Sequence, residues 1–524
     1  MAGINTTRTE AHSEFIVADR PVRRAERAAF VATTLSLGVV VVGATLLRFW
    51  DLGTKSLWYD EAYSLFMARH SLQEMISLLA SFDNHPPLYY VFLHGWMRIV
   101  GDGDVAARIP SAAAGVATVV VTFLLTRELA GVRVAFVAAV LLAAAPFLVL
   151  AGQEARMYPF LALFSAGASY ALWRALQEPL RRWWLGYVVW MTLALYTHYV
   201  AVLVLIAHAA YVTMAERNKA GLWLRWTGIV VVASLPLLFL VWSQFATARA
   251  LPAFQHPLRW RALLDLLGLL SFGGGLFGTG SYYQRGTMPP LLQIVLLLPF
   301  LALALGGLAR MGVRPRAFTL AYLVVPVAVT VLVSIRQDVF QERYFSFLQP
   351  PFTIMLAAGI ISLMAGRIFG RVLSLLGLVL LAGLTVAALV GASRDAPDYD
   401  WREAGRYVTA EARAGDFMLY VPPFIAIPFE HYYRGAAVPP QLSSREVLTT
   451  AKLAAQGKLR LRTTVPVAAL PAIARAHPRM WIVSSAALGP RVPVGIAEVM
   501  APFFRQAQER RFGLVSVSLW EARP

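Results

Sequence analysis

The 524-residue sequence contains no cysteine, and only 15% of its residues are charged. Without cysteine the chain can form neither disulfides nor cysteine-ligated zinc sites, and thiols say nothing about its redox compartment. About a quarter of the residues of a soluble globular protein are charged. The small charged fraction, together with 58% hydrophobic residues, therefore predicts a polytopic α-helical membrane protein.

Acidic residues are fewer than basic ones: the sequence has 29 Asp and Glu residues and 47 Lys and Arg residues, which gives a net charge of +18. Such a balance can indicate a nucleic-acid-binding protein, but no basic stretch carries the interleaved aromatic residues of a nucleic-acid surface. Most Lys and Arg residues instead lie in short clusters between apolar runs, the pattern that sets orientation in a bilayer. We therefore expect a lipid bilayer, and no nucleic acid, as a partner.

Eleven apolar runs approach the roughly 20 residues that a helix needs to cross a membrane. They lie near residues 29–48, 108–126, 134–151, 157–173, 183–198, 200–214, 226–244, 289–308, 318–335, 349–365 and 372–391. Basic clusters occupy every second loop, which predicts that these loops are cytoplasmic. The polar N-terminal tail 1–28 ends in a basic run and has no small-residue cleavage site after it, so we expect a cytoplasmic tail and an uncleaved anchor.

The predicted outer loop 49–107 contains the run HPPLYYVFLHGWMRIVG (85–101), which is almost apolar enough to be a span. If it crossed, every later loop would invert and the basic clusters would face outward. Its helical part, 86–100, would extend about 22 Å, less than the roughly 30 Å of the hydrocarbon core. We therefore predict a helix on or in the outer leaflet, with Pro86 in its first turn.

Residues 393–524 differ in character from the transmembrane domain, 29–392. DWREAGRYVTAEARAG (400–415) is typical of an amphipathic helix, whereas DFMLYV, RMWIVSS and FGLVSVSLWEA are typical of strands. About 130 residues suffice for one small domain. The tail is thus predicted to form an α/β domain, and the parity of the spans places it outside the cell.

Two adjacent carboxylates, Asp60 and Glu61 in SLWYDEAYS (56–64), follow the first span. Acids at a membrane surface are often simply solvated, so the pair alone is weak support for a function. If the segment is a loop or an extended stretch, adjacent side chains point to different sides. The two carboxylates are then expected to do different jobs.

Further polar side chains lie at the predicted outer ends of other helices. They are Asp83 and His85 in FDNHPPL, Glu154, Arg156 and Tyr158 in GQEARMYPF, His198 in YTHY, and Arg343 and Tyr344 in QERYF. Four of them have a structural alternative, since the two arginines could anchor lipid headgroups, His85 could cap a helix, and His198 could be a satisfied interfacial histidine. Polar groups at one depth from five stretches of chain nevertheless indicate one cavity, because burying them without a use is costly.

A cavity lined by carboxylates and guanidinium groups fits sugar transfer from a lipid-linked donor. A carboxylate can take the proton of an acceptor hydroxyl, while an arginine binds the donor phosphate and stabilises it as it leaves. Phosphate needs no general acid, and one carboxylate acting as base predicts inversion at the sugar. A lipid-sugar flippase or transporter is the alternative, but its polar groups should lie near the membrane midplane. A structural scaffold would need no such grouping.

The motifs LWYDEAYS, FDNHPPLYYVFLHGW, ARIPSAAAG, EARMYPF, YTHY and RYFSFLQPP follow one another over roughly residues 30 to 360. In this order they resemble the bacterial membrane glycosyltransferases of the GT-C fold, in the family 39-like group related to protein O-mannosyltransferases and the lipid A aminoarabinose transferase. The resemblance implies an inverting enzyme that uses a polyprenyl-phosphate sugar, with two helices of the first outer loop along the membrane. It also implies Asp60 as the catalytic base and Arg156 as a contact of the donor phosphate.

We therefore expect a glycosyltransferase of the plasma (inner) membrane that transfers a sugar to a hydroxyl of a glycan, lipid or protein at the outer face. Asp60 and Glu61 are the predicted catalytic residues, with Glu61 in a positioning role, and the eight other polar side chains are predicted to bind substrate. In the aminoarabinose transferase an acidic-basic pair stands in the place of Asn84 and His85. This departure leaves a divalent metal, the one cofactor considered, and the identity of the sugar open.

Overall fold

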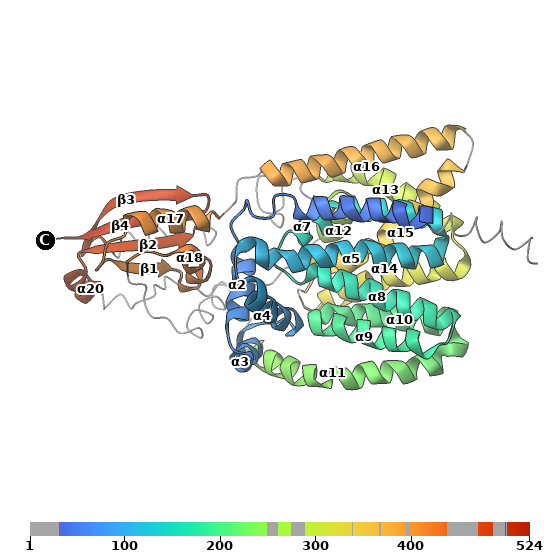
Figure 1. The fold of residues 1–524 in the computed structure, drawn as a ribbon, viewed down its shortest axis with the longest axis horizontal. Helices are drawn as coiled ribbons and strands as arrows, with labels where there is room; N and C mark the ends of the chain where they lie inside the picture. The colour runs from blue at the N-terminus through green and yellow to red at the C-terminus, as the bar shows by residue number, and fades with distance from the viewer. Residues whose placement is uncertain are drawn as a thin grey trace, which may run out of the picture.

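The computed structural model describes residues 31–248, 260–273, 289–337, 339–365, 368–394, 399–437, 470–485, 498 and 500–523. A bundle of helices is followed along the chain by a small α/β domain (Figure 1). The predicted fold class, a polytopic α-helical protein with a C-terminal α/β domain, is thus confirmed. The predicted tail 1–28 lies outside the described residues.

The bundle consists of long helices that run side by side, together with short helical segments next to them (Figure 1). They are the first helix, Val31–Phe49, followed by α5 (Asp104–Ala130), α6 (Val132–Ala144), α7 (Pro146–Gly152), α8 (Tyr158–Gln177), α9 (Arg181–Thr197), η1 (Tyr199–Ala201), α10 (Val202–Ala215), η2 (Arg217–Lys219), α11 (Ala220–Ala248), α13 (Pro290–Arg310), α14 (Val313–Ser334), η3 (Glu342–Leu348), α15 (Gln349–Met364) and α16 (Ile368–Arg394). Within the described ranges six helices are long and apolar enough to cross a membrane, or seven if the bent pair α6–α7 is one span. Each of the expected spans falls on a helix of the bundle, but their number as membrane crossings stays a prediction.

Helices α13 and α15 meet at a contact between their backbones. A methyl group on Gly307 would overlap the carbonyl oxygen of Met355, and one on Gly359 would overlap that of Leu303. Only a residue without a Cβ atom permits this approach, which is the usual way in which membrane helices pack closely. The contact fixes α15 against α13, and α15 follows directly on η3.

Three short helices lie at the end of the bundle that faces the C-terminal domain (Figure 1). They are α2 (Tyr59–Arg69), α3 (Leu72–Phe82) and α4 (Leu88–Val100). The resemblance implied two such helices, whereas the structure has three. Helix α4 was expected to begin at residue 86 but begins at Leu88, so Pro86 precedes it and does not lie in its first turn. Because α4 has only 13 residues, it would extend about 20 Å. Its placement in the outer leaflet stays a prediction.

Between the predicted spans 226–244 and 289–308, where only an outer loop was expected, lies the helix α12 (Trp260–Phe272). Its 13 residues are too few for a span, so the search for spans did not reveal it. Buried Leu266, Leu270 and Phe272 join the core of the bundle. The segment is therefore part of the packed structure.

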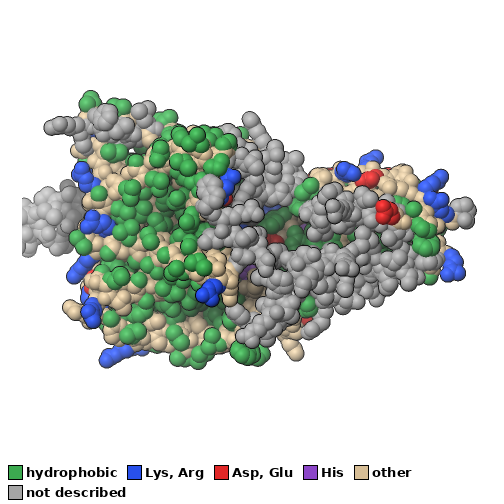
Figure 2. Space-filling view, turned by 180° about the vertical axis from the view of Figure 1, so that it is seen from behind, with side chains coloured by type: hydrophobic (Ala, Val, Ile, Leu, Met, Phe, Trp, Pro, Cys, Tyr) green, Lys and Arg blue, Asp and Glu red, His purple; other side chains and the backbone are tan. Residues whose placement is uncertain are grey.

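Hydrophobic side chains cover the middle of the bundle, and Lys and Arg side chains gather at the end away from the C-terminal domain (Figure 2). This separation is what alternating basic loops require of an antiparallel bundle. It agrees with the expected topology, in which the C-terminal domain and the basic loops lie on opposite sides. Which side is cytoplasmic stays a prediction.

The C-terminal domain has a four-stranded sheet of order β1-β2-β4-β3. Its elements are α17 (Trp401–Glu411), β1 (Phe417–Val421), η4 (Pro423–Ile425), α18 (Ala426–Tyr432), α20 (Leu470–Ala476), β2 (Arg479–Ser485), β3 (Phe504–Phe512) and β4 (Val515–Ala522). Strands β1 and β2 are parallel, whereas β4 pairs antiparallel with β2 and β3. The sequence predicted β1, β2, β4 and α17 but missed β3, FRQAQERRF, because most of that edge strand is exposed and carries no apolar alternation.

Candidate active site

Asp60 and Glu61 lie in the first turn of α2, so the expected loop or extended segment is wrong at this position. Carboxylates are favoured there by the partial positive charge of a helix N-terminus. The side chain of Glu61 also accepts a hydrogen bond from the N–H of Trp58 at 3.2 Å, which caps the helix. Successive residues of an α-helix are rotated by about 100°, and the two carboxylates therefore still face different surroundings.

Glu61 is buried, with 1% of its surface exposed. Arg108 of α5 donates to both of its carboxylate oxygens at 2.7 Å, and the N–H of Ala155 donates at 2.8 Å. The bidentate ion pair with Arg108 joins α2 to α5. The hydrogen bond from Ala155 joins α2 to the turn before α8. The contacts suit the predicted positioning role. Arg108, which the sequence analysis did not single out, lies in the quoted motif ARIPSAAAG.

Asp60 has different partners, and its side chain is 23% exposed. One carboxylate oxygen lies 3.0 Å from Nη1 of Arg343 and 3.9 Å from Nη2 of Arg156. Arg156 also donates to the backbone carbonyl of Asp60 and to the hydroxyl of Ser64, both at 3.1 Å. Residues from α2, from the turn before α8 and from η3 thus form one charged cluster.

Arg156 is a buried cation, with 2% of its surface exposed. Burial alone would lower the pKa of Arg156, but Tyr158 and Asp60 raise that pKa well above its ordinary value. The guanidinium group therefore remains charged. Such a desolvated cation attracts an anion much more strongly than an exposed one does.

Four aromatic rings extend the charged cluster. The ring of Tyr344 lies 6.2 Å from that of Tyr158 and 4.7 Å from that of His198, and His198 lies 5.2 Å from His85. The guanidinium carbon of Arg343 is 5.9 Å from the Tyr158 ring and 5.6 Å from the Tyr344 ring. These rings connect the histidines to Asp60 through Arg343.

Asp83 holds His85 in place. Its carboxylate lies 2.7 Å from Nδ1 of His85 and accepts hydrogen bonds from the Tyr90 hydroxyl at 2.8 Å and the N–H of Asn84 at 2.7 Å. Burial would raise the pKa of Asp83, but His85, Tyr90 and Asn84 together keep this pKa below its ordinary value. The ionised carboxylate places a proton on Nδ1 of His85, so Nε2 is the atom left for another partner.

Four polar atoms of the cluster are buried without a hydrogen-bond partner among the described residues: Nε2 of His85, Nε2 of His198, Nε of Arg156 and the hydroxyl oxygen of Tyr158. Nearly all buried polar atoms in proteins are paired, so a group of exceptions points to a polar ligand. His198 is satisfied on one side only, because its Nδ1 accepts from the N–H of Val200 at 3.3 Å. The interpretation of His198 as a satisfied interfacial histidine therefore holds for Nδ1 but not for Nε2.

Glu154 belongs to the same turn, where its carbonyl oxygen accepts a hydrogen bond from the N–H of Arg156 at 2.8 Å. A binding role for its partly buried side chain stays a prediction. In the part of the chain that the structure describes, no group of three or more His, Asp or Glu residues is placed to hold a metal ion. The question of a divalent metal stays open.

The helical bundle, the short helices at its end and the C-terminal α/β domain together define a membrane protein of the GT-C glycosyltransferase fold. Residues 84–243 match the family model of dolichyl-phosphate-mannose-protein mannosyltransferase. The matched range holds His85, Arg156, Tyr158 and His198, whereas Asp60 precedes it. The predicted resemblance to GT-C glycosyltransferases is thereby confirmed.

Solved structures of this fold superpose on nearly the whole chain. ArnT from Cupriavidus metallidurans bound to undecaprenyl phosphate has a TM-score of 0.57 and 16% identity over 93% of this chain and 97% of that chain. Its apo state has a TM-score of 0.59 and 15% identity over 94% and 98%. The archaeal oligosaccharyltransferase AglB from Archaeoglobus fulgidus, in complex with an inhibitory peptide and a dolichol-phosphate, has a TM-score of 0.52 and 13% identity over 93% and 74%. These similarities show a common fold. No curated protein matches the sequence.

Proposed function

We propose that this protein is an inverting glycosyltransferase, which transfers a sugar from a polyprenyl-phosphate donor to an acceptor hydroxyl at the outer face of the membrane. The observation that carries the proposal is the position of the Asp60 carboxylate, 3.0 Å from Arg343 and 3.9 Å from Arg156. A base and two cations in one cluster are what displacement of a phosphate by a hydroxyl requires. The undecaprenyl phosphate and dolichol-phosphate of the compared structures support a lipid phosphate as carrier.

In the proposed reaction the donor phosphate binds between Arg156 and Arg343, where planar guanidinium groups match its oxygens. The phosphate competes with Asp60 for Arg343, so donor binding leaves the carboxylate available as a base. Asp60 takes the proton of the acceptor hydroxyl while the oxygen of that hydroxyl forms a bond to the anomeric carbon of the sugar. The bond from that carbon to the phosphate oxygen breaks on the opposite face, and polyprenyl phosphate leaves with the bonding electron pair.

The sugar is assigned to the histidine side of the cluster. Nε2 of His85 and Nε2 of His198 are buried polar atoms that have no protein partner among the described residues, and sugar hydroxyls can both donate to and accept from such nitrogens. Aromatic rings such as Tyr158 and Tyr344 offer apolar surface to a sugar ring. The acceptor then approaches from the Asp60 side.

A lipid-sugar flippase is the second candidate, because α6 and α7 form a helix bent by 54°, and transporters often bind substrate at broken helices. The break in this bundle is filled by the protein itself. Buried Arg48 donates to the carbonyl oxygens of Ala143 at 2.9 Å and Leu142 at 3.3 Å, just before the break. Nε of Arg48 has no partner among the described residues, but the unpaired atoms of His85, His198 and Arg156 gather beside Asp60 at helix ends, which favours the transferase.

Substitution of Asp60 by Asn tests the proposal. Asn preserves the shape of the side chain but cannot accept the proton, so transfer should fall by about two to four orders of magnitude. The purified variant in nanodiscs is given undecaprenyl phosphate carrying labelled mannose or aminoarabinose, with an envelope extract as acceptor, and donor binding is measured in parallel. We expect binding to be retained.

Glu74→Gln is the matched control, because Glu74 is an exposed carboxylate on the neighbouring helix α3, with 53% of its side chain accessible. It should transfer sugar at the parental rate. Near-parental transfer by Asp60→Asn would show that this carboxylate is not the base. Movement of the intact lipid-linked sugar across a vesicle membrane, without transfer, would favour the flippase.

A further inference from the structure

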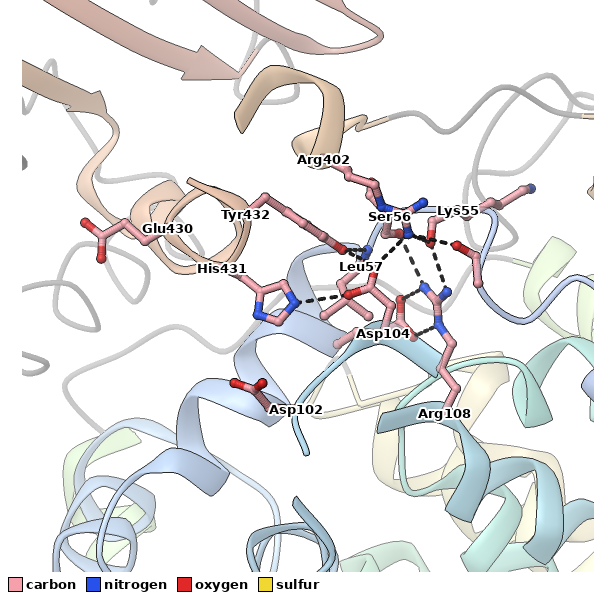
Figure 3. Close-up of polar contacts among 12 residues, drawn as sticks. Lys55, Ser56, Leu57, Asp102, Asp104, Arg108, Arg402, Glu430, His431 and Tyr432 are labelled. Carbon is pink, nitrogen blue, oxygen red and sulfur yellow. Dashed lines mark hydrogen bonds and ion pairs between the residues drawn. The ribbon is translucent and has the colours of Figure 1, made fainter. Parts of the chain in front are cut away.

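The C-terminal domain is joined to the bundle at Asp104, the first residue of α5 (Figure 3). The side chain of Asp104 is 11% exposed and accepts hydrogen bonds from three side chains of the domain. Arg402 of α17 donates at 2.6 Å, and Tyr432 and His431 of α18 donate at 2.7 and 3.0 Å. A carboxylate of the helical bundle is thus bound by three donors of the C-terminal domain.

Two of these side chains, Arg402 and Tyr432, also hold the segment 53–57, which leads into α2 (Figure 3). The hydroxyl of Tyr432 accepts a hydrogen bond from the N–H of Leu57 at 2.7 Å. Arg402 donates to three carbonyl oxygens of the segment, at 2.8, 3.1 and 3.3 Å. Leu57 lies three positions before Asp60, so the domain holds the start of the helix that carries the proposed base.

Arg108 binds the same segment from the bundle side. It donates to the carbonyl oxygens of Lys55 at 2.9 Å and Ser56 at 3.3 Å, in addition to its ion pair with Glu61. The segment is therefore fixed between Arg108 of the bundle and Arg402 of the domain. A shift of the domain cannot occur without a change in the hydrogen bonds that precede α2.

The C-terminal end of α2 is bound to helix α18 of the domain. Nη2 of Arg69, the last residue of α2, lies 2.7 Å from Nδ1 of His431. Because arginine can only donate, Nδ1 of His431 is the acceptor and Nε2 carries the proton donated to Asp104. At the first residue of α2, the ring of Tyr59 meets that of Phe424 edge to face at 5.3 Å. The domain thus contacts helix α2 at both its start and its end.

We propose that the C-terminal domain positions the catalytic helix α2, with Tyr432 as the positioning residue. The proposal rests on the proposed function of Asp60. The Tyr432 hydroxyl connects Asp104 with the N–H of Leu57, and its loss leaves the buried N–H without a partner. Asp104 keeps Arg402 and His431, so the domain stays docked while the backbone at Leu57, next to the start of α2, loses its tie to the domain.

The test compares Tyr432→Phe with Tyr433→Phe. Both changes remove one hydroxyl at the same end of α18, but the hydroxyl of Tyr433 bonds within the domain, to the N–H and carbonyl of Ala437 at 2.8 and 3.2 Å. Turnover and KM are measured with undecaprenyl-phosphate mannose or aminoarabinose in nanodiscs. Tyr432→Phe should lower kcat about tenfold to a hundredfold through misplacement of the base. KM for the donor should stay within about twofold, because Arg156 and Arg343 lie on other elements.

A second measurement is independent of activity. Hydrogen exchange followed by mass spectrometry should show faster exchange of the peptide spanning 52–58 in Tyr432→Phe, and parental exchange there in Tyr433→Phe. Unchanged kcat, unchanged exchange, or an equal effect of both substitutions would overturn the proposal. If the parent protein transfers no sugar at all, the proposed function has failed. Exchange at Leu57 then decides by itself whether the domain orders α2.

Discussion

Two neighbouring acids acquire different chemistry from the residues that meet them. Glu61 is enclosed by Arg108 and the N–H of Ala155, so its lone pairs are used in holding three segments together. Asp60 is partly open and faces Arg343 and Arg156. A group that must exchange a proton with a substrate has to be accessible, and only Asp60 meets this condition.

The assignment of Arg156 to the donor phosphate leads to a prediction for a change that keeps the charge. Arg156→Lys replaces a planar guanidinium group by a single ammonium group. In the parent, Nη1 donates to the Asp60 carbonyl and the Ser64 hydroxyl, while Nη2 faces the Asp60 carboxylate at 3.9 Å. The affinity for undecaprenyl phosphate should fall about tenfold, as measured by native mass spectrometry or ligand-binding fluorescence. Arg98→Lys, at an exposed position of α4, is the control. Parental affinity in Arg156→Lys would refute the assignment.

At the scale of residues, the sequence motifs predicted most of the cluster, because charged and aromatic side chains at helix ends are visible in one dimension. The partners that fix them were not predicted. Arg108, Tyr90 and Asp104 each bond to a residue far along the chain or on another helix face. Such pairs depend on how helices are rotated against each other, and an arginine next to a span looks the same whether it faces lipid headgroups or a buried carboxylate.

Among the elements, α2 has the most constrained position. Its first turn is bound to α5 through Glu61 and Arg108, and its two ends are bound to α18 of the C-terminal domain. Helix α2 is too short to be stable by itself. These tertiary contacts therefore determine where the helix lies and how Asp60 is presented.

The ion pair between Glu61 and Arg108 predicts that substitutions of Glu61 and Asp60 differ in effect, the first lowering stability and the second lowering transfer. Glu61→Gln leaves the buried guanidinium of Arg108 without a counter-charge, which should lower the free energy of unfolding by about 3 kcal/mol. Asp60→Asn should leave stability close to the parental value while abolishing most transfer. Thermal unfolding in one detergent, followed by tryptophan fluorescence, measures the first effect. A larger loss of stability in Asp60→Asn than in Glu61→Gln would contradict this division.

Helix α12 and strand β3 were missed for a physical reason. Helix α12 is apolar but too short for a span, and β3 is an edge strand of which most residues are exposed. Periodicity detects an element through its buried face. An element with little buried surface, or with a length below the expected threshold, therefore leaves no clear pattern in the sequence.

For the whole molecule, composition and the spacing of basic clusters predicted the helical bundle, and the pattern of the tail predicted a small C-terminal α/β domain. The features of the bundle follow from the bilayer, which imposes a length and a charge asymmetry on every span. The docking of the domain on segment 53–57 could not be predicted. It is made of single hydrogen bonds between residues that are separated by more than 300 positions, such as Leu57 and Tyr432.

The predicted orientation can be measured on a background without cysteine. Ala410→Cys in α17 and Gly312→Cys before α14 both introduce a thiol at an exposed position. In intact cells an impermeant maleimide should label Ala410→Cys, whereas Gly312→Cys should be labelled only after the cells are lysed, because basic loops remain in the cytoplasm. Labelling of Gly312→Cys in intact cells, with Ala410→Cys protected, would invert the topology.

The backbone contact of Gly307 and Gly359 bears on how such a transferase can change its substrates. Arg343 lies on η3, which continues into the helix that this contact fixes, whereas Asp60 lies on a helix held by side chains of a separate domain. A backbone contact cannot adapt by a change of rotamer, but hydrogen-bonding side chains can be replaced one at a time. Under the proposed function, the donor-binding Arg343 therefore follows a rigid contact of the bundle. The position of the base Asp60 depends instead on side-chain contacts that single substitutions in the C-terminal domain can alter.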